Sequence, residues 1–249
     1  RLQGDWSSDV CSSDLMRLRL VVDDRDEELP WWLDPSTNLL GEGTWADGGG
    51  SVPEAGACTL YSGGASGAEA AFGEAAERWG LTEVAFTFEG HRQARTVGSK
   101  QLTPWELEAG DVSLVYVSRR LNRSYNENGL IRKVLQTLWH MVSRSQQVFV
   151  VGAIQEDGTV VGGTGWSVEL ARMWEKDLWV FDQERRGWFH WEGGQWRPGH
   201  AAIRSAEFCG TGTRYLEASG REAIEALFQE AFGGRSEERR VGKECRSRW

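Results

Sequence analysis

Two glycine-rich segments stand between an apolar stretch and a stretch with helical periodicity. They read SGGASG at 62–67 and GGTG at 162–165. Free N–H groups at the start of a helix, with about half a positive charge from the helix dipole, attract anions. The two segments therefore predict turns that hold a phosphate group. The residues expected to contact this anion are Ser62, Gly63, Gly64, Ser66, Gly67, Gly162, Gly163, Thr164 and Gly165.

Basic and titratable side chains follow other apolar stretches and could complete an anion site. His91 and Arg92 come after the stretch at 83–90, and Arg119 ends the stretch at 111–119. Arginine forms charge-assisted hydrogen bonds with phosphate oxygens, and histidine can hydrogen-bond a base or a phosphate. A surface histidine without a ligand and a solvated helix face are the plain alternatives. The histidines lack the spacing of metal ligands, so no metal is expected.

Known phosphate-loop motifs do not match either glycine segment. Neither is followed by Gly-Lys-Ser/Thr, as in a Walker A loop, and neither fits Gly-x-Gly-x-x-Gly cleanly. The alternative for both is a tight turn between a strand and a helix. A third glycine-threonine segment, CGTGT at 209–213, is interpreted as a flap over the ligand or as a cap for the last helix.

Alternating strand and helix patterns must position these residues. Strands are predicted at 57–62, 83–90, 111–119, 146–154 and 178–185, and a tryptophan-rich β-hairpin at 187–197. Helices are predicted at 67–80, 102–111, 126–145, 166–176 and 220–232. This alternation favours an α/β fold, a Rossmann-like and mostly parallel sheet with helices on both faces. In such sheets the ligand binds beyond the carboxyl ends of the strands.

Both ends of the chain resemble translated sequencing adapters. The adapter DNA TCTTCCGATCT translates to Ser-Ser-Asp-Leu, as at 12–15, and its reverse complement to Arg-Ser-Glu-Glu, as at 235–238. We interpret 1–15 and 235–249 as adapter-derived, 16–56 as an N-terminal arm or linker, and 57–234 as the ligand-binding domain with its C-terminal hairpin and helix.

The composition limits the classes of partner. The chain has a formal net charge of −9, and the flanks contribute −2 and +3, so the segment between them carries −10. That charge disfavours nucleic acid as a partner. Without a signal peptide or an apolar run near 18 residues, a cytoplasmic location and no membrane partner are expected. Homo-oligomerisation is left open.

Three segments resemble one superfamily. SGGASGAE, GHR and GGTGWSVELA resemble the SLOG superfamily of Rossmann-like nucleotide-binding proteins, over roughly residues 57–182. That superfamily includes the LOG-type ("lysine decarboxylase-like") phosphoribohydrolases, the YpsA group, molybdenum-cofactor carrier relatives and DNA-processing protein A. The resemblance implies a nucleotide or nucleotide-derived small molecule as ligand, with no cofactor assigned.

The LOG-type relatives also imply a reaction. Their motif P-G-G-x-G-T-x-x-E corresponds to 161–169 here, where Glu169 matches and Val161 and Trp166 replace the proline and threonine. Their catalytic arginine lies in an Arg-Lys pair that Arg132 and Lys133 resemble. The leading hypothesis is nucleotide binding. The alternatives are a phosphoribohydrolase that uses Glu169 and Arg132, a DNA-processing-like single-strand binder, and a structural or interaction protein whose glycines only form turns.

Overall fold

The computed structural model describes residues 52–125 and 129–246, with side chains described up to Gly233. The chain divides into units 1–48 and 49–249, and all described residues belong to the second. Residues 1–15 and most of the predicted arm at 16–56 lie outside the described residues. A short 3₁₀ helix, Ala55–Ala57, leads into the first strand.

An eight-stranded sheet forms the centre of the second unit, in the order β3-β2-β1-β8-β4-β5-β6-β7. The pairs from β3 to β5 are parallel, and β5–β6 and β6–β7 are antiparallel. The strands are β1 (Thr59–Ser62), β2 (Thr82–Thr87), β3 (Ser99–Gln101), β4 (Gln147–Gly152), β5 (Asp177–Asp182), β6 (Gly187–Glu192), β7 (Gln195–Gly199) and β8 (Glu207–Gly212).

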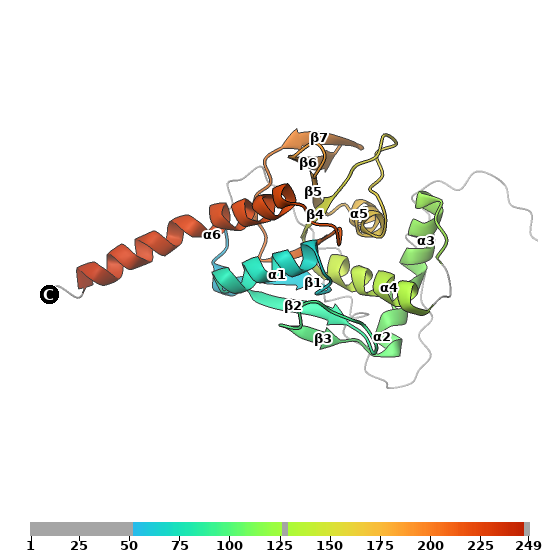
Figure 1. Cartoon of the computed structure of the whole chain (residues 1–249), viewed down its shortest axis with the longest axis horizontal. Coiled ribbons are helices and arrows are strands. Elements are labelled where there is room, and N and C mark those ends of the chain that lie inside the picture. Colours follow the sequence, from blue (N-terminus) through green and yellow to red (C-terminus); the bar gives the residue numbers. More distant parts are fainter. Residues whose placement is uncertain (1–51, 126–128, 247–249) are drawn as a thin grey trace, which may run out of the picture. The chain divides into compact units, whose positions relative to one another are not determined.

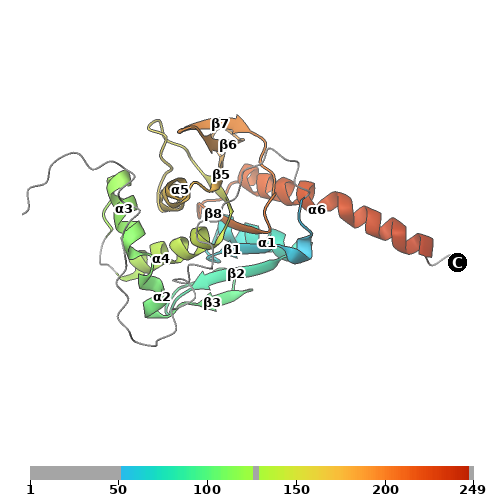
Figure 2. The same cartoon turned by 180° about the vertical axis from the view of Figure 1, so that it is seen from behind.

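Helices cover both faces of this sheet (Figures 1 and 2). One face packs against α1 and α6, and the other against α4 and α5, with α2 and α3 packed on α4 and α5. The helices are α1 (Ala68–Trp79), α2 (Pro104–Glu108), α3 (Asp111–Leu121), α4 (Gly129–Arg144), α5 (Thr164–Met173) and α6 (Ala218–Arg246). In the described part of the chain, none of them is long and apolar enough to cross a bilayer.

Strand β4 shows why the sheet needs helices on both sides. All six of its residues are buried. Phe149 and Val151 pack in the cluster on the α1/α6 face, whereas Val148 and Val150 pack in the cluster on the α4/α5 face. Successive side chains of a strand point to opposite faces, so a continuous apolar run requires a cover on each. The predicted α/β class is confirmed, and the predicted hairpin is β6–β7, which extends the same sheet.

The predicted strand at 111–119 is wrong, because these residues form helix α3. Its valines suggested a strand, but Leu114 and Val117 are buried and Leu121 packs beside them, at helical spacing. Asp111 lies in the first turn, and Asn122 ends the helix in the left-handed conformation. Packing of this apolar face outweighs the strand propensity of valine.

Two strands were not predicted. The segment read as a glycine-threonine turn at 209–213 is mostly β8, which lies between β1 and β4. Strand β3 is fully exposed and has only three residues. Helix α6 includes the predicted helix at 220–232 and continues to Arg246, beyond the predicted boundary at 234.

A buried histidine joins α4 to α2. His140 Nε2 lies 2.7 Å from the carbonyl oxygen of Glu106, so Nε2 donates and carries the proton. Nδ1 can then accept from Arg144 Nη1, at 2.6 Å. Burial and then the charge of Arg144 lower the pKa of His140 to about 4. His140 is therefore neutral and fixed in one tautomer.

This histidine should make stability depend on pH. Its pKa is about 4 in the folded chain and about 6.5 in the unfolded chain, so the unfolded chain takes up the proton first as the pH falls. The free energy of unfolding should drop by on the order of 3 kcal/mol between about pH 7 and pH 4. Urea unfolding at several pH values gives the free energy of unfolding of the protein and of His140→Gln, in which the amide can still donate to Glu106. The difference between the two curves of free energy against pH is the contribution of His140. Parallel curves would contradict this contribution.

Candidate functional site

The carboxyl edge of β1, β8 and β4 is the point where the connections diverge. After β1 the chain enters α1 on one face of the sheet, and after β4 it enters α5 on the other. Open α/β sheets bind their ligands at such a divergence of the connections. Because β8 lies between β1 and β4, the loop after β8 separates the two glycine turns. Three loops therefore meet at this edge.

The first glycine turn is filled by a carboxylate of the chain itself. Glu69 Oε2 accepts the backbone N–H of Ala65 at 3.0 Å, and Oε1 accepts the Thr211 hydroxyl at 2.8 Å. A side chain on Gly63 would place its Cβ 2.7 Å from Glu69 Oε2. Burial raises the pKa of the Glu69 carboxyl, and the bonds from Thr211 and Ala65 oppose that rise. The position expected for a bound anion is thus taken by Glu69.

The rest of the first turn is packed against the segment 93–95. The carbonyl of Gly64 accepts the N–H groups of Ala94 and Arg95, at 2.9 and 3.1 Å. The hydroxyl of Ser62 donates to Glu83 Oε1 at 3.1 Å. Ser62, Gly63 and Gly64 are buried, whereas Ser66 is exposed and Gly67 is partly exposed. Only the second half of this turn can therefore meet a ligand.

The second glycine turn is open to solvent. Gly162 and Gly163 are exposed, and a Cβ at either would have no atom within 4 Å. Gly163 is the N-cap of α5 and forms no side-chain cap. The N–H groups of Gly165 and Trp166 donate to the carbonyls of Gly162 and Gly163, at 3.2 and 3.0 Å, which leaves the N–H groups of Gly163 and Thr164 at the start of the helix. Thr164 is half-buried, and Gly165 is buried against the carbonyl of Val160.

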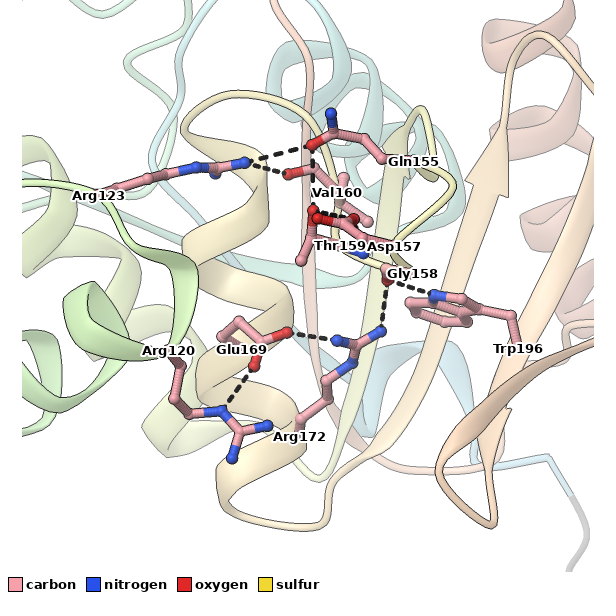
Figure 3. Close-up of polar contacts among 10 residues, drawn as sticks. All are labelled: Arg120, Arg123, Gln155, Asp157, Gly158, Thr159, Val160, Glu169, Arg172 and Trp196. Carbon is pink, nitrogen blue, oxygen red and sulfur yellow. Dashed lines mark hydrogen bonds and ion pairs between the residues drawn. The ribbon is translucent and has the colours of Figure 1, made fainter.

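An arginine from the end of α3 fixes this second turn. Arg123 Nη1 donates to the carbonyl of Gly162 at 2.7 Å, and Nη2 donates to the carbonyl of Val160 at 3.1 Å. Figure 3 shows its guanidinium reaching the loop between β4 and α5. Two hydrogen bonds from one rigid group hold the turn in a single conformation.

The loop after β8 places two residues at this edge of the sheet that were not among the predicted ligand contacts. The N–H of Thr213 donates to the carbonyl of Val151 at 2.8 Å, and the carbonyl of Thr213 accepts the N–H of Ala68 at 3.0 Å. These two hydrogen bonds connect the loop to β4 and α1. Arg214 and Tyr215 follow, and both are exposed. The Arg214 guanidinium lies 5.9 Å from the centroid of the Tyr215 ring. The sequence signal for these two residues is TRY at 213–215, directly after CGTG at 209–212. It points to this edge of the sheet only when β8 is known to lie beside β1.

Glu169 is engaged in a buried ion-pair cluster (Figure 3). Its carboxylate is 3% exposed, receives Arg120 Nε from α3 at 3.0 Å and also pairs with Arg172 on α5. Arg172 in turn donates to the carbonyl of Gly158 at 2.7 Å and lies 3.5 Å above the centroid of the Trp191 ring. Both carboxylate oxygens are occupied by protein cations. Glu169 therefore joins α3, α5 and the hairpin.

Arg132 belongs to a different cluster. It pairs with Asp111 at the start of α3, which also accepts the Tyr125 hydroxyl and the Gln136 amide, each at 2.6 Å. The neighbouring Lys133 lies 5.6 Å from the centroid of the Phe88 ring. The structure therefore gives Arg132 and Glu169 separate partners rather than a shared one.

The other residues predicted to contact the ligand lie in the loop after β2 and on α3. His91 stacks on Phe88 at 4.7 Å, its Nδ1 is 3.1 Å from the Thr87 hydroxyl, and burial lowers its pKa. Arg92 follows it and is exposed. Arg119 is exposed on α3 and does not follow a strand. The part of the chain that the structure describes holds no group of three or more His, Cys, Asp or Glu residues able to bind a metal.

Comparisons of the chain with protein-family models, curated proteins and solved structures return no match. The resemblance to the SLOG superfamily therefore stays a prediction that rests on the sequence motifs alone.

Proposed function

We propose that the chain binds a nucleotide or a nucleotide-derived anion at the carboxyl edge of β1, β8 and β4. The observation that carries the proposal is the open glycine turn at the start of α5. A Cβ at Gly162 or Gly163 would meet open space, the N–H groups of Gly163 and Thr164 remain for a ligand, and Arg123 holds the turn in place. N–H groups fixed in this way, together with the helix dipole, stabilise a phosphate group.

The neighbouring loop supplies the other groups that a nucleotide needs. Arg214 can form charge-assisted hydrogen bonds with a phosphate. The ring of Tyr215 is 77% exposed, and a base stacked on an aromatic ring gains about 1–3 kcal/mol. Ser66 and Gly67 border the same edge from the first turn. In this proposal Ser62, Gly63 and Gly64 shape that turn around Glu69 and do not contact the ligand.

The contacts of Glu169 and Arg132 favour binding over hydrolysis at these two residues. Cleavage of an N-glycosidic bond needs a carboxylate that can act on the sugar or on water. Both oxygens of Glu169 face guanidinium groups, and Arg132 is paired with Asp111. A polyanionic strand is also disfavoured, because Glu156 and Asp157 are exposed in the loop that leads to the second glycine turn.

Thermal unfolding in the presence of nucleotides tests the proposal. The panel contains nucleoside mono-, di- and triphosphates, cyclic nucleotides, ADP-ribose and pterin nucleotides. A ligand at about one hundred times its dissociation constant should add about 2.7 kcal/mol, which corresponds to roughly 5–10 °C in Tm. Arg214→Gln should reduce the shift, whereas Arg204→Gln, an exposed arginine before β8, should keep it. The proposal is wrong if a folded sample shows no shift with any member of the panel.

A further inference from the structure

Large exposed apolar side chains are concentrated on three neighbouring helices. Nine such residues occur in the described part of the chain, and six of them lie between 105 and 131. These six belong to α2, α3 and α4, and α4 packs against both of the others. They are Trp105, Val112, Val115, Tyr116, Leu130 and Ile131, with exposed fractions of 67%, 85%, 40%, 50%, 61% and 68%. Patches of this kind mark interaction surfaces on otherwise polar proteins.

Helix α3 carries a continuous stripe within this patch. Val112, Val115, Tyr116 and Arg119 follow one another at intervals of three or one residues and so share one side of the helix. The opposite side carries Leu114 and Val117, which are fully buried. Helix α3 therefore carries apolar side chains both on its buried side and on its solvent-exposed side. In both views of the fold it lies at the end of the unit opposite the C-terminal end of α6 (Figures 1 and 2).

The charges at the two ends of this stripe are opposite. Glu108, the last residue of α2, is exposed and is separated from the start of α3 by two residues, and Arg119 is exposed in the last turn of α3. A partner of uniform charge would gain at one end and lose at the other. A second copy of the same helix, running antiparallel, places each acidic end beside a basic end. It also aligns the two helix dipoles in the favourable antiparallel sense.

We propose that the outer stripe of α3 is the contact surface between two copies of this chain, related by a two-fold axis. The axis passes between Val115 and Tyr116, so that these residues face each other across it. Arg119 then meets Val112 of the partner subunit, and Glu108 of the partner subunit precedes that valine by four residues in the sequence. A two-fold contact uses the same patch on both subunits, which a stripe with complementary ends satisfies. The apolar centre supplies affinity, and the charged ends fix the antiparallel direction.

Sedimentation velocity of the full chain, over a wide range of micromolar concentrations, tests this arrangement. We expect a dimer that Val112→Glu converts to a monomer, because this position is exposed and the change leaves the buried side of α3 intact. Val97→Glu, at an exposed valine outside the patch, is the matched control and should remain a dimer. A monomeric full chain, or a dimer unchanged by Val112→Glu, would overturn the proposal.

A charge reversal tests the antiparallel direction. Arg119→Glu alone and Glu108→Arg alone should each weaken the dimer by about tenfold in dissociation constant, because like charges then meet at both ends. The double variant restores opposite charges and should return the dissociation constant close to that of the original chain. If the double variant is weaker than both single variants, the two residues do not meet and the proposed direction is wrong. Circular dichroism of each variant verifies that the helices are intact.

Discussion

Replacing Glu169 by glutamine should lower the free energy of unfolding by about 3–5 kcal/mol. The side chain is 3% exposed and lies between Arg120 and Arg172, whose own side chain is 9% exposed. Glutamine keeps the shape but removes the negative charge, so it leaves the Arg172 guanidinium buried without its paired carboxylate. Because the carboxylate also joins α3 to α5, the loss should reduce the cooperativity between these helices.

Chemical denaturation of Glu169→Gln measures this loss, and Arg120→Gln is its matched control. The Arg120 side chain is 48% exposed, so removal of its charge should cost less than about 1 kcal/mol. A catalytic carboxylate would give the reverse pattern, with stability almost unchanged and turnover abolished. If Glu169→Gln is as stable as the original chain, then Glu169 is not the structural counter-ion described above.

Glu169 also shows what a motif match can and cannot predict. The match placed Glu169 on a helix after a glycine turn, and the structure has it there, on α5. It could not indicate that Arg120 would be present, because the valine-rich segment 111–119 was expected to be a strand. Once these residues form a helix packed on α5, Arg120 lies beside Glu169. A partner 49 residues away becomes visible only when the tertiary arrangement is known.

The fold class was predictable because buried parallel strands and amphipathic helices leave strong periodic patterns. Strand β8 was missed for a physical reason: EFCGTG contains two glycines and few β-branched residues, so its local propensity for a strand is weak. Its pairing with β1 and β4 and the burial of Phe208 and Cys209 stabilise it instead. The loop that carries Arg214 and Tyr215 could not be assigned to the site without that strand.

The two glycine turns are similar in sequence, but only the first is closely packed against other parts of the chain. In the first, glycine is required because Glu69, the segment 93–95 and the loop after β8 lie close to the backbone. In the second, Gly162 has a positive φ of 68° that suits glycine, while Gly163 has an ordinary helical φ of −60° and open space around it. No contact within the described residues therefore requires a glycine at 163, whereas close approach of the proposed ligand would require one.

Gly163→Asp should separate stability from ligand binding. Aspartate beside the positive end of the helix dipole interacts favourably with it, so the free chain should become more stable by about 0.3–1 kcal/mol. The same carboxylate occupies the place proposed for the phosphate and repels it. We expect the affinity for the nucleotide to fall at least about tenfold, equivalent to about 1.4 kcal/mol, as measured by isothermal titration calorimetry.

Gly163→Asn is the matched control for this charge, because asparagine has nearly the same shape and is neutral. It should stabilise the free chain less than the aspartate variant does, and it should bind the nucleotide more tightly. Equal losses in both variants would mean that the added bulk, not the charge, excludes the ligand. Unchanged binding in both would place the phosphate away from α5 and refute the proposed role of the second turn. If Gly163→Asp is more stable than the original chain and loses affinity for the nucleotide, the anion binds at the N-terminus of α5.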